Sequence, residues 1–255
     1  MTQRVALVRP PSSRMAEGIV TFGERQPVDA ELAARQHEAY VEALAGAGWA
    51  IREVAPADDL PDSAFVEDTV VVCDGLAVLA RPGAPERRAE VAGTEEAVRE
   101  LGLEVARIED PGTLDGGDVL TVGRTLYVGR GGRTNEVGIA RLEELVAPRG
   151  YEVVTVPLRP VLHLKSAVTA LPDGTMIAAD PSLVDTGPLP ALQAVPEEAG
   201  SHVVPLGGDT ILMATSAPRS AELFTRRGLD VVAVDVGEFE KLEGCVTCLS
   251  VLVEA

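Results

Sequence analysis

The residues best suited to covalent chemistry are a thiol near the C-terminal end and an imidazole near the middle of the chain. Cys248 stands at the mouth of the apolar run that ends the sequence, and His163 lies within the stretch Val161 to Ser166. The chain has 3 histidines and 3 cysteines, so few other pairs of this kind can form. An imidazole close to a thiol can stabilise the thiolate and carry protons. The two residues therefore predict a cysteine nucleophile, provided that the fold brings them together.

The pattern supports two other uses of the cysteines less well. Cys245 precedes Cys248 with two residues between them, but a redox Cys-x-x-Cys pair belongs at the start of a helix, and here we expect a strand to follow. A zinc site would need a second pair of Cys or His residues at ligand spacing, which the sequence lacks. We therefore expect no bound metal, and we expect Cys245 and Cys73 to be buried as small apolar residues.

Two acidic clusters lead into β-branched runs elsewhere in the chain. One is Asp62 with Glu67 and Asp68, and the other is the stretch Asp115-Gly116-Gly117-Asp118. Each cluster alone is typical of turns and strand ends. Together with the thiol and the imidazole, the carboxylates favour a cationic substrate such as a guanidinium, whose planar fork two carboxylates can hold.

The charge and composition narrow the class of partner. The 255 residues carry 40 acidic and 22 basic side chains, a net charge of -18 that opposes binding to phosphate backbones. Aromatic residues make up 3% of the chain, too few for the stacking platforms that hold single strands. Residues 1–10 lack the pattern of a signal peptide, and no run reaches the ~18 apolar residues of a membrane span. We expect a cytoplasmic protein with reduced thiols that binds a small molecule, and neither nucleic acid nor membrane.

The elements that must position these residues recur along the chain. Pairs of short strands are joined by turn signals such as Asp74-Gly75, and a helical pattern and a further strand follow most pairs. The expected strand pairs are 65–73 with 76–80, 118–122 with 125–128 and 166–171 with 175–179, and a weaker strand lies at 210–214. The expected helices and following strands are 88–101 with 103–108, 135–145 with 152–156, 190–198 with 202–206, and 221–227 with 229–234. Such a unit repeats about five times at roughly fifty residues per unit, a period typical of radial arrays.

The two ends of the chain complete each other in this scheme. A strand at 5–8, a helix at 29–47 and a strand at 50–54 lack a first strand, which the run 248–253 can provide. Pairing the end of the chain with its start would leave no open edge in a ring of units. We therefore predict one catalytic α/β domain over 1–255, a closed five-bladed pseudosymmetric propeller. A doubly wound α/β fold is less favoured, because no Gly-x-Gly-x-x-Gly follows the first strand.

With these residues in view, the sequence resembles the dimethylarginine dimethylaminohydrolases, members of the guanidine-modifying pentein superfamily. The resemblance runs over essentially the whole chain, and seven motifs occur in the family's order. They are Leu60-Pro61-Asp62, Phe65-Val66-Glu67-Asp68, Arg81-Pro82-Gly83-Ala84-Pro85, Leu114 to Leu120, Arg133-Thr134-Asn135, Leu162 to Ser166 and Thr247-Cys248. The resemblance implies the pentein fold, in which ββαβ-type units surround a central active site.

The resemblance also implies a role for each matching residue of the reaction centre. Cys248 would be the nucleophile and His163 the general acid and base. Asp115 would orient and charge the imidazole. Asp68, with Glu67 beside it, would bind the guanidinium of the substrate.

Three further positions would bind the amino-acid end of the substrate. Asp62 matches the contact to the α-amino group. Arg87 and Arg133 match the pair that clamps the α-carboxylate, a task that suits the bidentate guanidinium fork.

Two parts of the sequence depart from the family's pattern. Glu243 stands where relatives carry Asp, which leaves open the shape of the wall that includes Leu242. The N-terminal lid, residues 14–27, matches no family motif. Counting back from Val28-Asp29 places Val20 where a backbone carbonyl would meet the substrate amine.

The reaction implied by the resemblance is hydrolysis of Nω-methylated arginines to citrulline and methylamine or dimethylamine. It would pass through a covalent thiouronium on the cysteine and would need no cofactor. An arginine deiminase would use the same sulfur chemistry on arginine and release ammonia. Members of that family are longer chains than this one, so the length favours the methylated substrate. A non-catalytic propeller that binds a partner would not need Cys, His and Asp at matched positions. A homodimer is a further expectation.

Overall fold

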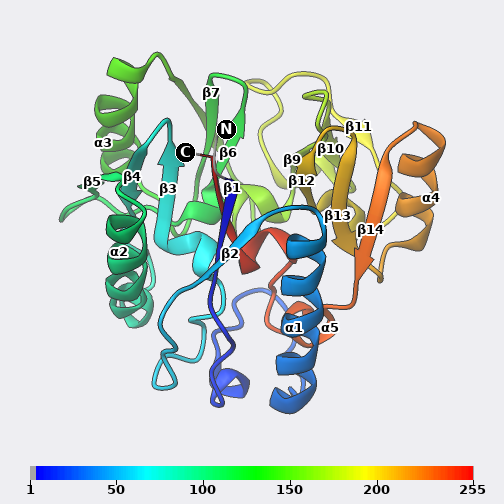
Figure 1. The fold of residues 1–255 in the computed structure, drawn as a ribbon. Coiled ribbons are helices and arrows are strands. Elements are labelled where there is room, and N and C mark those ends of the chain that lie inside the picture. The colour runs from blue at the N-terminus through cyan, green and yellow to red at the C-terminus, as the bar shows by residue number, and fades with distance from the viewer. Residues whose placement is uncertain (1–3, 255) are drawn as a thin grey trace.

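In the computed structural model, which describes residues 4–254, the chain folds into five three-stranded sheets of one topology. In each sheet the first strand is antiparallel to the second, and the second is parallel to the third. Four of the sheets are β3 (Val70–Cys73), β4 (Leu76–Leu79) and β5 (Glu104–Arg107); β6 (Val119–Val122), β7 (Thr125–Arg130) and β8 (Glu152–Pro157); β9 (Thr169–Ala170), β10 (Met176–Ala178) and β11 (Gln193–Ala194); and β12 (Val203–Gly207), β13 (Thr210–Ala214) and β14 (Asp230–Val234). The repeated topology confirms the predicted five-bladed propeller (Figure 1).

The first blade is assembled from both ends of the chain. Strand β15 (Val251–Glu254) pairs antiparallel with β1 (Arg4–Val8), and β1 pairs in parallel with β2 (Ala50–Glu53). The two termini accordingly lie close together in Figure 1. The predicted closure of the ring by the C-terminal run is confirmed.

Helices connect the parallel strands and lie on the outside of the molecule (Figure 1). They are α1 (Ala30–Gly46), α2 (Val91–Glu100), α3 (Glu136–Val146) and α4 (Pro218–Arg226), with a short α5 (Gly237–Glu240) after the last blade. Asp29 and Asn135 cap α1 and α3 by accepting hydrogen bonds from backbone N–H groups in the first turn. Within residues 4–254, none of the helices combines the length and apolar character required to cross a bilayer.

The fourth blade differs from the prediction. The prediction of a helix at 190–198 is wrong. Among the described residues, no α-helix lies between β10 and β12. Pro196 explains the failure, because proline inside a helix removes a hydrogen bond and clashes with the preceding turn. The strand expected at 202–206 is β12, which opens the fifth blade instead of ending the fourth.

A single 3-10 turn precedes the first strand of every blade. These turns are η2 (Val66–Thr69), η4 (Gly116–Asp118), η6 (Leu164–Ser166), η8 (Glu198–Ser201) and η9 (Val246–Leu249). Cys248 lies in η9 and not on the closing strand as expected. The turns η2, η4, η6 and η9 pack against one another, so residues at the start of different blades meet in space.

The closing strand contributes to the apolar core between the first two blades. Val253 is 1% exposed and lies in a cluster with Val5 of β1, Val70 of β3 and Ala97 of α2. Burial of such side chains supplies most of the free energy that holds the blades together. The ring is therefore closed by apolar packing as well as by the backbone ladder.

We expect Val253→Ala to lower the free energy of unfolding by about 2–3 kcal/mol, because two buried methyl groups are lost and a cavity remains. Glu254→Ala, on the same strand but exposed, should change it by about 0.5 kcal/mol or less. Urea unfolding of both variants measures the difference. Equal effects of the two substitutions would contradict a closing role for the buried face of β15.

Candidate active site

A cavity beside the 3-10 turns, the site cavity, brings together residues from distant parts of the chain. It is lined by Ile19, Asp62, Phe65, Asp68, Arg87, Arg133, Leu162, His163, Leu242, Glu243, Gly244 and Cys248. Cys248, His163 and five of the predicted binding residues thus converge. Asp115 lies fully buried against His163, and Glu67 and Val20 do not line this cavity.

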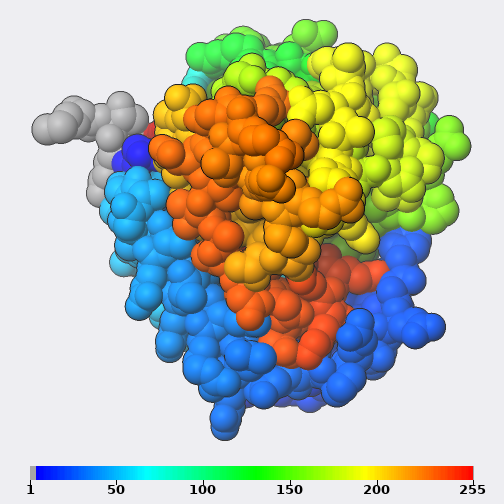
Figure 2. Space-filling model, turned by 90° about the vertical axis from the view of Figure 1, so that its right-hand side faces the viewer, coloured from blue at the N-terminus to red at the C-terminus, as the bar shows by residue number. Residues whose placement is uncertain are grey.

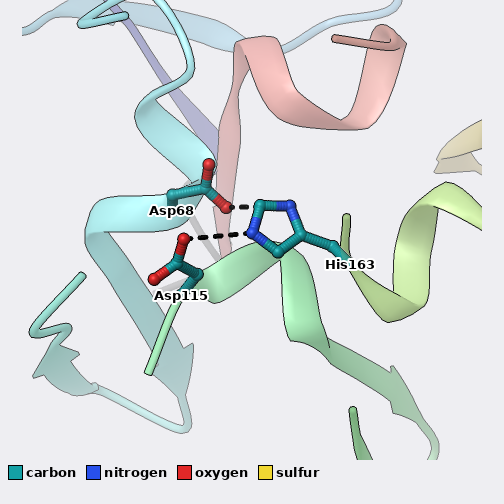
Figure 3. Close-up of side chains that lie close together, drawn as sticks. All are labelled: Asp68, Asp115 and His163. Carbon is teal, nitrogen blue, oxygen red and sulfur yellow. Dashed lines mark hydrogen bonds and ion pairs between the residues drawn. The ribbon is translucent and has the colours of Figure 1, made fainter. Parts of the chain in front are cut away.

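His163 pairs with two carboxylates, Asp68 and Asp115, which lie on the same side of its ring (Figure 3). Its Nε2 is 3.0 Å from Oδ2 of Asp115, and its Nδ1 is 3.8 Å from Oδ1 of Asp68. The imidazole is 2% exposed. The predicted pairing of Asp115 with His163 is thereby present, and Asp68 lies near the second ring nitrogen.

The motif Asp115-Gly116-Gly117-Asp118 explains how the imidazole is held. Asp118 accepts a hydrogen bond from the backbone N–H of Leu164 at 3.0 Å, which fixes the turn that carries His163. A Cβ on Gly117 would lie 2.7 Å from Nδ1 of His163, and one on Gly116 would lie 2.0 Å from the carbonyl oxygen of Glu67. Both glycines are therefore needed for η4 to pack beneath the site.

The electrostatic surroundings favour a protonated imidazole. Burial lowers the pKa of His163, but Asp68, Asp118 and Asp115 together raise it to about 9. Asp68, Asp115 and His163 have ligand atoms close enough to share a metal ion. A metal would require neutral imidazole, and Arg87 already lies 2.6 Å from Asp68, so this arrangement favours an ion-pair network over metal binding.

Asp68 is kept ionised by a buried arginine. Burial alone would raise the pKa of Asp68, but His163 and Arg87 hold it below its usual range. Nη1 of Arg87 donates to Asp68 at 2.6 Å, and its Nε and Nη2 donate to Glu90 at 3.1 and 2.8 Å. The guanidinium of Arg87 is therefore bound mainly to the protein's own carboxylates, and its predicted contact with a ligand carboxylate stays a prediction.

Arg133 is the better placed of the two predicted clamp arginines. Its Nη1 is 3.7 Å from Oδ2 of Asp115 and has no hydrogen-bond partner among residues 4–254. Its Nη2 donates to the hydroxyl of Thr21 in the lid at 3.2 Å. A ligand carboxylate would give the buried Nη1 the partner that it lacks. The α-carboxylate contact stays a prediction.

The thiol of Cys248 contacts a second sulfur. Its Sγ is 3.4 Å from Sγ of Cys245 and 3.4 Å from the backbone nitrogen of Cys245. The pKa of Cys248 is raised well above its usual range. The causes are the hydrogen bond with Cys245, burial, and the nearby carboxylates of Glu67 and Asp68. This surrounding favours the neutral form of the Cys248 thiol. Cys245 is buried as expected, but a 3-10 turn and not a strand follows it.

Glu67 points away from the site cavity, unlike its neighbour Asp68. It lines a larger cavity, about 410 Å³, whose walls include residues of the first strands of the blades. Nζ of Lys165 donates to its Oε1 at 2.6 Å, while burial raises the pKa of Glu67 to about 7 despite this partner. A direct contact of Glu67 with a guanidinium in the site cavity is therefore not supported by the geometry.

Two carboxylates, Asp62 and Glu243, hold the N-terminal lid, residues 14–27, at the site cavity. Asp62 accepts the backbone N–H of Ile19 at 3.1 Å, so this predicted ligand for an amine also holds the lid. Glu243 accepts the N–H groups of Thr21, Phe22 and Gly23 at 2.6, 2.6 and 2.7 Å. Figure 2 shows this blue N-terminal region beside the orange-red C-terminal region.

Of the two predicted residues Leu242 and Val20, only Leu242 lines the site cavity. Leu242 lines the site cavity as expected, and Glu243 next to it has a left-handed backbone with φ of 60°. Val20 is not among the lining residues, whereas the preceding Ile19 is. The predicted contact of the Val20 carbonyl with a ligand amine stays a prediction.

Sequence reasoning missed several residues that support the site. Glu90 follows Arg87 by one helical turn, a spacing that signals an ion pair. The sequence places Asp118 in an acidic cluster but does not show that it binds the backbone of Leu164. No local signal marks Glu243 as a partner of residues 21–23, because about 220 residues separate them.

We expect the imidazole of His163 to titrate near pH 9 in the ligand-free protein, as followed by NMR of the ring carbons. Asp115→Asn should lower this midpoint because it removes the carboxylate at Nε2. His37, whose pKa burial lowers to about 4, provides the internal control. A midpoint near 6.5 for His163 in the unmodified protein would overturn the ion-pair description.

The raised pKa of His163 makes the free energy of unfolding depend on pH. Because the folded pKa of about 9 lies above the ordinary 6.5, the protonated imidazole stabilises the fold. This contribution is fully present below about pH 6.5 and is lost as pH rises through about 9.

We expect Glu243→Ala to release the lid. Three backbone N–H groups lose a charged acceptor, so their hydrogen exchange should accelerate by roughly tenfold or more. Glu240→Ala provides the matched control, since Glu240 contacts Ser216 and not the lid. Hydrogen exchange resolved at residues 21–23 measures the effect, and unchanged protection in Glu243→Ala would refute the latch.

Comparison with known proteins identifies relatives of this chain by sequence and by structure. No protein-family model matches the chain. The sequence is 60% identical to a dimethylarginine dimethylaminohydrolase of Streptomyces coelicolor, over 98% of this chain and 97% of the relative. It is 32% identical to the Pseudomonas aeruginosa enzyme of that name, over 96% of this chain and 97% of the relative. A solved structure of the Pseudomonas enzyme, a cysteine-to-serine variant with citrulline, aligns with a TM-score of 0.92 at 31% identity, covering 99% of this chain and 100% of that chain. The chain therefore belongs to the dimethylarginine dimethylaminohydrolase family, with its pentein fold.

Proposed function

We propose that this protein hydrolyses Nω-methylated arginines to citrulline and methylamine or dimethylamine. The observation that carries the proposal is the convergence of Cys248, His163 and Asp68 on one cavity of a chain in this family. The citrulline bound to the cysteine-to-serine variant of the Pseudomonas relative supports citrulline as the product and a cysteine as the reacting group.

The site cavity suits a substrate with a cation at one end and an amino acid at the other. The carboxylate of Asp68, held ionised by Arg87, would bind the guanidinium N–H groups. Arg133 would bind the α-carboxylate, and Asp62 would receive the α-amino group. Leu162, Leu242 and Phe65 give the cavity apolar wall that can accept N-methyl groups.

Substrate charge would activate the nucleophile. In the free site, the hydrogen bond with Cys245, burial and the neighbouring carboxylates raise the pKa of Cys248 and favour the protonated thiol. A bound guanidinium brings positive charge next to the sulfur, which favours loss of the thiol proton to solvent. The thiolate then attacks the central guanidinium carbon, and a neutral tetrahedral adduct forms.

His163 would carry protons through both halves of the reaction. Its imidazolium donates a proton to the methylated nitrogen, the C–N bond breaks, and the amine leaves a thiouronium on the sulfur. The neutral imidazole then takes a proton from water as the oxygen attacks the same carbon. Collapse of this second adduct breaks the C–S bond and releases citrulline. Asp115 and Asp68 stabilise the imidazolium that begins and ends the cycle.

The cellular setting is also a proposal. The net charge of -18 and the three free cysteines support a cytoplasmic enzyme of arginine metabolism, acting on a small molecule and not on nucleic acid or membranes. We propose that residues 1–255 act as one catalytic domain and that it associates as a homodimer.

The decisive experiment is to measure citrulline after separate incubation with asymmetric dimethylarginine, monomethylarginine and arginine. We expect the two methylated substrates to be turned over. Turnover of arginine alone would replace the proposal with an arginine deiminase, and no citrulline from any of the three would reject hydrolysis and favour a binding module.

We expect Cys248→Ser to lower kcat by at least roughly a thousandfold with the fold unchanged by circular dichroism. Cys73→Ser is the matched control, because Cys73 is equally buried but lies in β3 and does not line the site cavity. Normal turnover by Cys248→Ser would require a different nucleophile.

A further inference from the structure

The contact between Cys245 and Cys248 has no role in the proposed hydrolysis. Their sulfur atoms are 3.4 Å apart, and Cys73, the third cysteine, lies in a different blade. Burial as a small apolar residue would account for Cys245 alone, but it does not account for its sulfur lying against that of the nucleophile.

The local backbone explains the contact. Cys245 is the residue before the 3-10 turn η9, and Cys248 is the third residue of that turn. Side chains three residues apart eclipse each other in a 3-10 helix, so the turn places both sulfurs on one side. The N–H of Cys248 donates to the carbonyl of Cys245 at 3.0 Å, and the hydroxyl of Thr247 lies 3.2 Å from Sγ of Cys245.

We propose that Cys245 and Cys248 form a site of oxidative modification, at which a hydroperoxide converts the two thiols to a disulfide that reversibly blocks the nucleophile. A disulfide needs the sulfurs at about 2.05 Å, and rotation of the two side chains can supply the remaining approach of roughly 1.4 Å. The proposal goes beyond the hydrolase function, because the sulfur chemistry does not depend on which substrate the site cavity takes.

The access of the oxidant, and not thiolate character, favours Cys248 as the first sulfur to react. The hydrogen bond between the two sulfurs raises the pKa of Cys248 and lowers the pKa of Cys245, which suits Cys245 to the later attack on an oxidised Cys248. Cys248 lines the site cavity, whereas Cys245 does not, and Cys245 is 4% exposed. A small hydroperoxide can therefore meet Cys248 directly, and Cys245 waits behind it as the resolving thiol.

The chemistry balances with hydrogen peroxide as the oxidant. The sulfur of Cys248 attacks one peroxide oxygen, the O–O bond breaks, and a sulfenic acid and water form. The sulfur of Cys245 then attacks the sulfenic sulfur, the S–O bond breaks, and a second water leaves. Two thiols lose two electrons and two protons, and one peroxide is reduced to two waters. The disulfide would also prevent further oxidation of Cys248 to the irreversible sulfinic acid.

The test is to treat the full-length protein with hydrogen peroxide and to analyse it by intact mass and by non-reducing peptide mapping. We expect the loss of two hydrogens, a peptide crosslink between Cys245 and Cys248, and loss of citrulline formation that dithiothreitol restores. Cys73→Ser should behave in the same way. Addition of two oxygens to Cys248 with Cys245 still a free thiol would overturn the proposal.

Cys245→Ser provides the second arm. It should lose no hydrogens under peroxide and should instead gain oxygen on Cys248, in a form that dithiothreitol progressively fails to reverse. Full recovery of this variant, equal to that of the unmodified protein, would contradict the resolving role. Because the mass readouts do not use activity, a failure of the hydrolase assignment would leave this test intact.

Discussion

The site depends on one constraint: a buried charge needs a partner of opposite sign. Asp68, Arg87, His163 and Asp115 are each 5% exposed or less, and an isolated ion in such surroundings would neutralise. The protein alternates the signs, with Arg87 paired with Glu90 and Asp68 and His163 paired with Asp68 and Asp115. Asp68 thus pairs with both cations, so its removal would leave Arg87 with Glu90 alone and His163 with Asp115 alone.

The ring makes this alternation possible because each blade begins with the same short turn. Asp68, Asp115, His163 and Cys248 come from four blades, and each lies in such a turn or directly before it. The sequence predicts this convergence well, since the hairpin turn signals and the helical patterns that follow them mark the repeats. The motif residues around them then fall at equivalent positions. What the sequence predicts is therefore the set of residues at the ring centre.

The sequence predicts direction and long-range contact less well. Adjacent residues of a 3-10 turn project about 120° apart, so Glu67 faces Lys165 and the larger cavity while Asp68 faces His163. The helix expected at 190–198 does not form, because Pro196 inside that stretch cannot donate the hydrogen bond that a helix needs. The latch between Glu243 and the lid joins segments that share no pattern, and only the folded chain shows it.

Closure of the ring and presentation of the Cys248 thiol depend on the same short segment. Cys248 lies in the turn that ends at Leu249, and β15 begins at Val251 and pairs with β1. Turn η9 packs against η2, which carries Asp68, and against β12 of the fifth blade. The pairing of β15 with β1 therefore anchors the C-terminal side of the turn that brings the thiol to the carboxylates of the other blades. The strand that closes the ring also fixes one end of the segment that completes the site cavity.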